Sequence, residues 1–185
     1  MPEIALDSPL EDDVIRLRLM ERRDMDAARR LHNEFSVLLN LTDIRQVTEP
    51  EQEAWFDRLL ADRSKQRYVV TEVGCEQIVG TVRVDQIDLN NRNAMIGTDI
   101  DVAYRGKGYG RRSHCLITDY LFRQLGMHRI WLVTLSTNDV AISMYRKLGM
   151  KEEGVWRDAI WRDNGYVDLI QFGVIREEWV QSSGK

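Results

Sequence analysis

Three glycines within six residues constrain this chain more than any other feature. They stand in Arg105-Gly106-Lys107-Gly108-Tyr109-Gly110, after an apolar stretch that ends Ile100-Asp101-Val102 and before a helical pattern that begins at Gly110. Glycines let the backbone curl so that several N–H groups point into one hollow, and a helix start adds the positive end of its dipole. The segment therefore predicts a strand–loop–helix unit that binds an anion.

Charge and spacing narrow the choice of anion. Arg105, Lys107, Arg111 and Arg112 add positive charge suited to a pyrophosphate. The dinucleotide fingerprint requires Gly-x-Gly-x-x-Gly, but Arg111 stands where its third glycine should fall, and the Gly-Lys-Ser/Thr end of a Walker loop is absent. The spacing therefore excludes a nucleotide-dependent oxidoreductase or kinase.

Hydrophobic periodicity predicts a mixed α/β fold around one sheet. The expected order is strand, two helices, three strands, helix, strand, helix and two strands. We expect strands at Val14–Met20, Arg67–Val73, Gln77–Leu89, Ala94–Val102 and Ile130–Leu135, and two more within Glu153–Val174 that turn at Asp163-Asn164-Gly165. We expect four helices. The first runs from Asp24 as N-cap to about Phe35, the third from Gly110 to Leu125 and the fourth from Asn138 to Leu148. The second begins at Pro50, and its apolar face is expected to be Trp55, Phe56, Leu59 and Leu60.

Composition predicts one domain spanning residues 1–185, because 21.6 kDa and 43% hydrophobic residues suit a single core. The formal net charge of -4, without a long block of one sign, gives no footprint for nucleic acid or a membrane surface. The start of the chain is acidic rather than basic and apolar, so we expect a cytoplasmic protein. Cys75 and Cys115 are expected as reduced core thiols, and His32, His114 and His128 lack metal-ligand spacing, so no metal is expected.

A second motif follows the glycine loop by about thirty residues. Asn138 opens a helix that carries Ala141, Tyr145, Lys147 and Gly149 in the pattern Asn-x-x-Ala-x-x-x-Tyr-x-Lys-x-Gly. Together with Arg-x-x-Gly-x-Gly at residues 105–110, this pattern resembles the GNAT acetyltransferases, in which the final Phe is replaced here by Met150. Lys147–Gly154 and Asp163–Asp168 are similar to segments of the RimJ/RimL and spermidine acetyltransferase branch, and the similarity extends over nearly the whole chain.

The resemblance implies an acetyl-coenzyme A dependent N-acetyltransferase acting by direct transfer to a primary amine. It implies a mixed, mostly antiparallel sheet of about seven strands flanked by four helices and splayed between strands four and five, and a homodimer or larger homo-oligomer. It implies that acetyl-CoA is the only cofactor, and it offers a polyamine, a protein N-terminus or another small amine as acceptor. By the same resemblance, the coenzyme would bind to Ile100, Asp101, Val102, Arg105, Gly106, Lys107, Gly108, Tyr109, Gly110, Arg111, Asn138 and Tyr145, with free backbone groups around Asp99 to Val102 polarising the thioester.

The catalytic residues are less clearly indicated. Tyr145 lies two helical turns after Asn138, and the resemblance implies that it is the general acid towards the thiolate, although its spacing also fits a core position. The branch often has glutamate where this chain has Met95, so Asp99 is the candidate base, directly or through water, with Asp101, Glu34 and Asp43 left open. A module that binds coenzyme A but has lost the chemistry is the alternative function.

Overall fold

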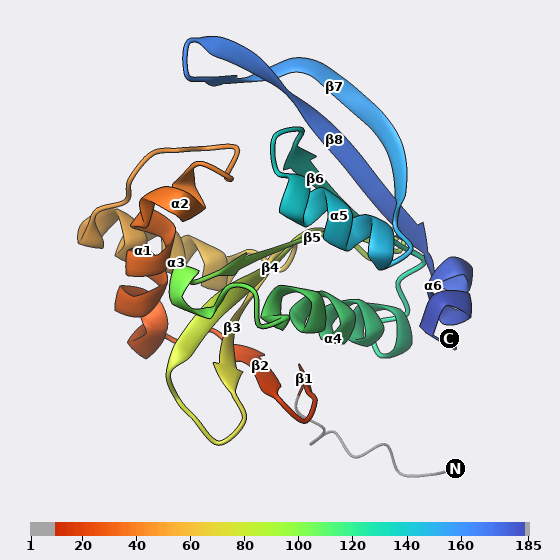
Figure 1. Ribbon diagram of the computed structural model, residues 1–185. Coiled ribbons are helices and arrows are strands. Elements are labelled where there is room, and N and C mark those ends of the chain that lie inside the picture. Colours follow the sequence, from red (N-terminus) through yellow and green to blue (C-terminus); the bar gives the residue numbers. More distant parts are fainter. Residues whose placement is uncertain (1–9, 184–185) are drawn as a thin grey trace.

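The computed structural model describes residues 10–183, and all of its strands lie in one sheet (Figure 1). The sheet order is β1-β2-β3-β4-β5-β6-β8-β7, and every neighbouring pair is antiparallel except β5 and β6. The strands are β1 (Leu10–Glu11), β2 (Ile15–Leu19), β3 (Gln66–Glu72), β4 (Ile78–Asp88), β5 (Asn93–Ile100), β6 (Arg129–Leu135), β7 (Lys151–Arg162) and β8 (Gly165–Ile175). The helices are α1 (Met25–Asn33), α2 (Phe35–Leu38), α3 (Glu49–Ala61), α4 (Tyr109–Arg123), α5 (Asp139–Lys147) and α6 (Arg176–Ser183), with 3₁₀ turns at Arg22–Asp24 and Val102–Tyr104.

The mixed α/β prediction is confirmed, with small differences in the number of elements. The described residues form eight strands rather than about seven, because Leu10–Glu11 pairs with Leu17 and Arg16 as a short edge strand. They form six α-helices rather than four, because the irregular stretch after residue 34 contains the four-residue α2 and the chain ends in α6. None of these helices is long and apolar enough to cross a membrane, within the part of the chain that the structure describes.

Alternating side chains of the sheet supply two cores. On β3, Tyr68 and Val70 point into the larger core under α4 and α5, whereas Val69 points to the other face, where α1 and α3 cover it. This is the period of two expected for a strand buried on both faces. The two helical layers therefore leave β4 and β5 in the centre of the molecule, with a helical cover on each side.

The sheet opens between β5 and β6. These two parallel strands pair only at Asn93–Arg129, Ala94–Ile130 and Met95–Trp131, while β5 continues to Ile100 and β6 to Leu135. The predicted splay between the fourth and fifth long strands is confirmed, since β1 precedes them as an extra short strand. Unpaired backbone along this opening can bind an extended ligand.

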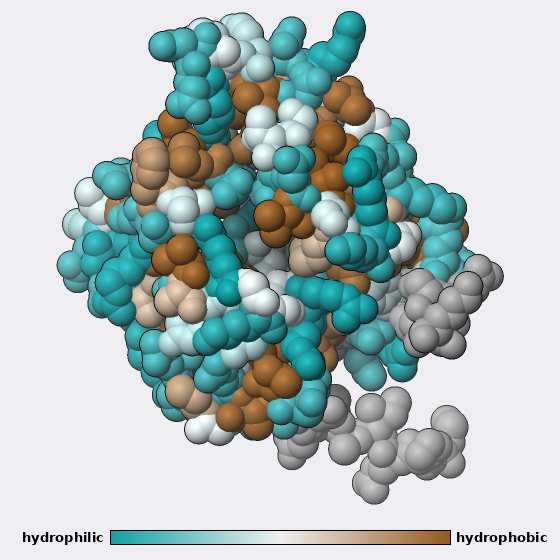
Figure 2. Space-filling model, in the orientation of Figure 1, coloured by the Kyte–Doolittle hydropathy of each residue, from teal (hydrophilic) through white to brown (hydrophobic). Residues whose placement is uncertain are grey.

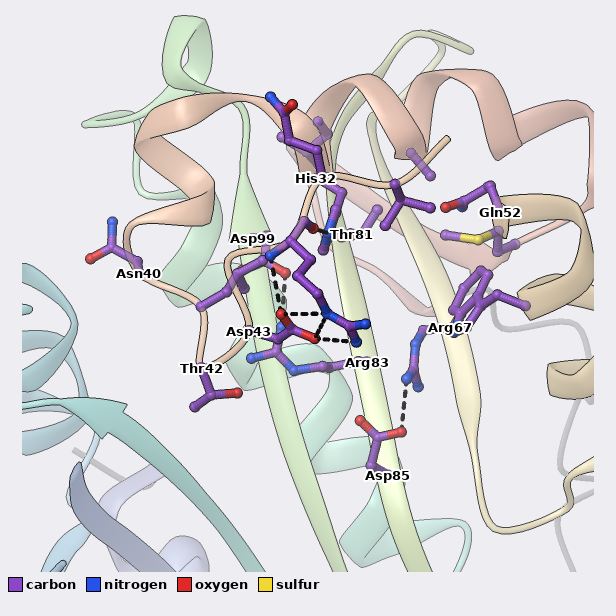
Figure 3. A pocket seen from close by; sticks show the side chains of 18 of the residues that line it. His32, Asn40, Thr42, Asp43, Gln52, Arg67, Thr81, Arg83, Asp85 and Asp99 are labelled. Atoms are coloured by element: carbon purple, nitrogen blue, oxygen red, sulfur yellow. Dashed lines mark hydrogen bonds and ion pairs between the residues drawn. The ribbon is translucent and has the colours of Figure 1, made fainter. Parts of the chain in front are cut away.

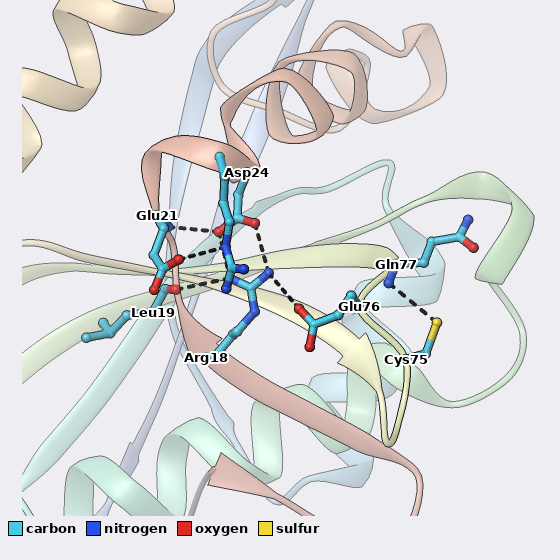
Figure 4. A network of polar contacts seen from close by, with 8 residues as sticks. Arg18, Leu19, Glu21, Asp24, Cys75, Glu76 and Gln77 are labelled. Atoms are coloured by element: carbon cyan, nitrogen blue, oxygen red, sulfur yellow. Dashed lines mark hydrogen bonds and ion pairs between the residues drawn. The ribbon is translucent and has the colours of Figure 1, made fainter.

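A buried ion pair fastens the start of α1 to the sheet (Figure 4). Both oxygens of Asp24 accept from Arg18 on β2, at 2.7 and 2.8 Å, and one also accepts from the Glu21 N–H. Burial alone would raise the pKa of Asp24, but these hydrogen bonds outweigh it and hold the pKa below its usual value. Asp24 is the residue before α1 as predicted, yet its side chain makes no capping bond there because Arg18 occupies the carboxylate.

Two side chains predicted to be buried lie at the surface. Leu60 is 68% exposed, because α3 rests on Phe56 with Trp55 and Leu59 beside it and Leu60 lies beyond that stripe. Cys75 is exposed in the turn between β3 and β4, whereas Cys115 on α4 is half-buried. The prediction of two core thiols is therefore wrong for Cys75.

Candidate functional site

The glycine loop joins the end of β5 to the start of α4, as the sequence predicts. Gly106 and Gly108 have φ values of +78° and +83°, in the left-handed region, where a side chain is strained although nothing lies within 4 Å of a Cβ at either position. Gly108 precedes α4. The first N–H group of α4 that donates within the helical pattern is that of Arg112, which donates to the Gly108 carbonyl at 3.0 Å. The N–H groups of Tyr109, Gly110 and Arg111 are therefore available to an anion.

A cavity of about 470 Å³ lies beside this loop. Lys107 and Arg111 line it, and neither has a carboxylate partner among the described residues. Lys107 rests on the ring of Tyr104, with its Nζ 4.8 Å from the ring centre. Arg112 differs from both, because Asp12 and Asp13 hold its Nη1 at 2.7 and 2.8 Å. Two cations that pair with no carboxylate of residues 10–183, together with the backbone donors of α4, fit the phosphates of a coenzyme.

Contacts of Tyr109 and Gly110 hold the end of the loop against the rest of the fold. The Tyr109 hydroxyl donates a hydrogen bond to Glu72 on β3, and the Tyr109 ring is buried in the larger core. Gly110 lies against Ile100 and Met144, both 3.7 Å from the position of a Cβ, which is ordinary contact. The start of α4 is thus packed between β5 and α5.

The backbone at the end of β5 is only partly free. The Asp101 N–H donates to the Val79 carbonyl at 3.0 Å, and the Arg105 Nε donates to the Ile100 carbonyl at 3.1 Å. The expectation of free groups throughout Asp99–Val102 is therefore wrong for these two. Residues of a strand direct their backbone groups to alternate edges, so Asp101 and Asp99 face β4 while Thr98 and Ile100 face the opening towards β6.

Thr98 and Asp101 also differ from the sequence-based expectation at the end of β5. Thr98 has a buried hydroxyl without a hydrogen-bond partner in the described residues, and sequence reasoning did not select this residue. Val102 begins a 3₁₀ turn, which the Asp101 carboxylate caps by accepting from the Ala103 N–H at 2.9 Å. Asp101 is thus engaged with the backbone, and the predicted strand ends at Ile100 rather than Val102.

Tyr145 lies on α5 and Asn138 is the residue before this helix, which covers the face of the sheet that holds the larger core. Tyr145 is 7% exposed, and the ring of His114 meets it edge-on with 5.2 Å between the ring centres. Burial raises the pKa of Tyr145 to about 12, while the positive charge of Arg83 acts in the opposite direction. Asn138 caps α5, because its Oδ1 accepts from the Ala141 N–H at 3.2 Å, and its side-chain NH₂ remains available to donate.

A second, larger cavity of about 630 Å³ lies on the other face of the sheet, between the α1–α3 cover and β3 to β6 (Figure 3). Figure 2 shows the side of the molecule drawn in Figure 1, where hydrophilic residues cover most of the view and the surface is hollowed near its middle. Asp99 and Asp43, two of the candidate residues for the acceptor pocket, line the large cavity together with Met95. The candidate Glu34 does not. The Glu34 carboxylate accepts from the hydroxyl of Ser36 and from the N–H of Val37, and so caps α2.

Charged residues form the floor of this acceptor cavity. Arg83 on β4 donates from its Nη1 to the Oδ2 of Asp99 on β5 at 2.8 Å, and Arg67 on β3 lies 2.8 Å from Asp85 on β4. Sequence reasoning selected Asp99 and missed the other three. The signal was present in the strand expected at Gln77–Leu89, where Arg83 and Asp85 replace apolar residues on one face.

One cavity thus lies beside the glycine loop and suits phosphates, and the other lies along β5 and β6 and suits a small polar acceptor. A family model described as an acetyltransferase (GNAT) domain matches residues 15–151. The chain belongs to the GNAT acetyltransferase family. It is accordingly an acetyl-CoA dependent N-acetyltransferase, and the loop at residues 105–110 fits that cosubstrate.

The chain is also similar to individual proteins whose activity is named. It is 28% identical over 166 residues to the spermidine N(1)-acetyltransferase of Escherichia coli (strain K12), covering 90% of this chain and 88% of that protein. It is 29% identical over 162 residues to the L-amino acid N-acetyltransferase AaaT of the same organism, covering 86% of this chain and 97% of that protein. The spermidine N-acetyltransferase of Vibrio cholerae, solved with CoA and spermine, shares the fold with a TM-score of 0.85 at 23% identity, over 90% of this chain and 98% of that one.

Proposed function

We propose that this GNAT enzyme moves the acetyl group directly from acetyl-CoA to a primary amine that enters the 630 Å³ cavity. The observation that carries the proposal is the position of β5. Its side chain at Asp99 lines the acceptor cavity, its backbone at Thr98 and Ile100 faces the opening, and its end leads into the glycine loop. One strand thereby connects the phosphate site, the reacting carbonyl and the amine.

The donor would bind along residues 100–111 and α5. In this proposal the N–H groups of Tyr109, Gly110 and Arg111 hold the phosphates together with Lys107, and Arg105 and Val102 flank them. Gly106 and Gly108 keep the loop open enough for a phosphate to approach the backbone. The pantetheine arm pairs with the open edge of β5 and with the NH₂ group of Asn138, which places the thioester carbonyl against N–H groups that stabilise its developing charge.

The acceptor must lose a proton before or during attack. An ordinary alkylamine costs about 4 to 5 kcal/mol to deprotonate at pH 7. We assign this step to Asp99, whose Oδ2 is engaged by Arg83 while its Oδ1 has no partner in the described part of the chain. The Oδ1 binds the ammonium group and relays one of its protons to water, and the neutral nitrogen attacks the thioester carbon. The C–S bond then breaks to release the thiolate, and the nitrogen loses its second proton to water, which leaves the neutral amide.

The departing thiolate would be met by Tyr145. Because burial raises the pKa of Tyr145 to about 12, the phenol stays neutral at physiological pH and acts as a hydrogen-bond donor to the sulfur. Full proton transfer to a thiolate is unfavourable for such a weak acid, so the final proton comes from solvent. This role differs from that of a strong general acid and still requires the hydroxyl.

A thiol-release assay with purified protein, acetyl-CoA and a panel of amines tests the proposal. We expect thiol release that requires an amine, with an N-acetylated product of the matching mass. If the protein binds coenzyme A but acetylates no polyamine, amino acid, amino sugar or peptide N-terminus, the proposal is wrong and a module that binds without chemistry takes its place. Asp99 in the wall of the cavity and the buried Tyr145 support the enzyme, whereas Met95, where the branch often has glutamate, is the residue on which the alternative rests.

We further propose that the chain acts as a single acetyltransferase domain in the cytoplasm and assembles as a homo-oligomer. The free thiols of Cys75 and Cys115 support a reducing compartment. The outer edge of β7 and three exposed aromatic side chains on the β7–β8 hairpin, Trp156, Trp161 and Tyr166, support self-association. Light scattering on the purified protein tests the assembly, and a monomer at micromolar concentration would contradict it.

A further inference from the structure

The charges of the acceptor cavity allow its substrate class to be named, on the basis of the proposed function. We propose that the acceptor is a small amine that also carries a carboxylate, as an α-amino acid does, and that Arg83 binds this carboxylate while Asp99 binds the amine. The spermidine acetyltransferases among the relatives would then differ from this chain in the acceptor and share the donor.

The first support is the balance of charge in the cavity. A polyamine carries several ammonium groups and requires a surplus of carboxylates around it. Here the acidic and the basic side chains are equal in number, four of each: Asp43, Glu51, Asp85 and Asp99 against Arg45, Arg58, Arg67 and Arg83. A cavity without net charge matches an acceptor without net charge, such as a zwitterion with one ammonium and one carboxylate.

The second support is the set of donors that remain unused on the cavity floor. Both terminal nitrogens of Arg67 are engaged, since one pairs with Asp85 and the other donates to the carbonyls of Gln66 and Val84. Arg83 has one partner in the described residues, Asp99 on Nη1, so its Nε and Nη2 have no partner there. Two neighbouring guanidinium N–H groups are the geometry that binds a carboxylate with both oxygens.

The third support is that Arg83 and Asp99 are neighbours. In an α-amino acid the ammonium and the carboxylate are attached to one carbon, so their partners must also lie side by side. Within residues 10–183 the Oδ1 of Asp99 has no partner, and the Oδ2 of the same carboxylate is 2.8 Å from Arg83. One substrate carbon placed over this pair would have its nitrogen on Asp99 and its carboxylate on Arg83.

The fourth support is the way in which the fold holds Arg83. Arg83 faces Gly97 across β4 and β5, and a Cβ at Gly97 would lie 2.5, 2.5 and 2.6 Å from the Cζ, Nε and Nη2 atoms of Arg83. Three nearly equal distances mean that the flat face of the guanidinium group lies on the glycine. The guanidinium group therefore lies across β5, and Arg83 lines the acceptor cavity from this position.

The test compares each amino acid with its own carboxamide, which keeps the amine and lacks the carboxylate. We expect a kcat/KM for the acid about 10- to 100-fold above that for the amide, and above that for spermidine or a peptide N-terminus. In the variant Arg83→Gln we expect kcat/KM to fall for both substrates, because Asp99 loses its ion-pair partner, and to fall at least about 10-fold further for the acid than for the amide. Arg157→Gln, an exposed residue of β7 outside both cavities, is the matched control and should change neither value.

The outcomes separate this inference from the proposed function. Transfer to spermidine, to amides or to peptides at least as efficient as transfer to amino acids overturns the inference and leaves an N-acetyltransferase. Equal losses for acid and amide in Arg83→Gln also overturn it. Absence of transfer to every amine, with coenzyme A bound, overturns the proposed function itself. Arg83→Lys and the wild-type panel decide the question if Arg83→Gln does not fold, as judged by circular dichroism and coenzyme A affinity.

Discussion

The guanidinium group of Arg83 lies flat on the backbone of Gly97, its partner residue across β4 and β5. No other residue type leaves room for this contact, because a Cβ would lie 2.5 Å from the Arg83 Cζ. The position from which Arg83 reaches Asp99 therefore depends on a glycine that is not part of the loop or of any turn. The floor of the acceptor cavity follows from the register between these two strands.

Gly97→Ala should displace Arg83 and impair the acceptor side alone. We expect KM for the amine to rise about 10-fold or more, with the affinity for coenzyme A unchanged, because the glycine loop lies elsewhere. Steady-state kinetics and calorimetry measure the two quantities. Gly154→Ala is the matched control, since nothing lies within 4 Å of its Cβ position, and an equal effect of both variants would contradict the role given to Gly97.

Tyr145→Phe tests the proposed donor to the thiolate. Because the pKa of Tyr145 is raised to about 12 by burial, the hydroxyl acts as a neutral hydrogen-bond donor, and we expect kcat to fall about 10- to 100-fold with little change in coenzyme A affinity. The same pKa predicts that the pH–rate profile of the wild type shows no descending limb from this phenol below about pH 10. Tyr166→Phe, at an exposed site on β8, is the control. Full activity of Tyr145→Phe would leave Tyr145 as a core residue only.

Gly108→Ala tests the loop that precedes α4. The residue would have to adopt φ +83°, which costs about 1 to 2 kcal/mol, and its side chain would stand where a phosphate approaches the backbone. We expect the dissociation constant of coenzyme A to rise about 10-fold or more. Gly74→Ala carries the same backbone strain at φ +77° in the turn between β3 and β4, so it should lower stability similarly without weakening coenzyme A binding. If Gly108→Ala and Gly74→Ala weaken coenzyme A binding equally, the loss comes from lower stability and not from the phosphate site.

Much of the fold follows from the sequence because its elements are long and periodic. Ile117 and Leu121 on α4 and the alternation of β3 predict their elements and the faces that are buried. Three elements were missed: β1 and α2 have two and four residues, too few for any period, and α6 has eight, only about two helical turns. The glycine loop was found because a phosphate site is built from consecutive residues.

The acceptor cavity could not be predicted in the same way. Asp99 was selected from its place in the chain, but its partner Arg83 is sixteen residues away and is brought to it by the pairing of Arg83 with Gly97. The effect of burial on Tyr145 likewise depends on His114 and Phe172, which come from other elements. Register and packing between distant segments therefore decide the chemistry of this side of the site.

Asp24→Asn tests the ion pair that fastens α1 to the sheet. Asp24 is 4% exposed, and loss of its charge leaves Arg18 facing a neutral amide, so we expect the free energy of unfolding at pH 7 to fall by about 2 to 3 kcal/mol. The hydrogen bonds lower the folded-state pKa of Asp24, so the stabilisation is complete above the unfolded-state value near about 3.9 and is lost as pH falls below it and through the folded pKa. Urea unfolding at pH 7 and at about pH 3 should thus show a gap between wild type and variant that narrows in acid. Asp163→Asn, in the exposed turn between β7 and β8, should behave as wild type at both values, and a gap that does not change with pH would show that the charge of Asp24 is not what stabilises α1.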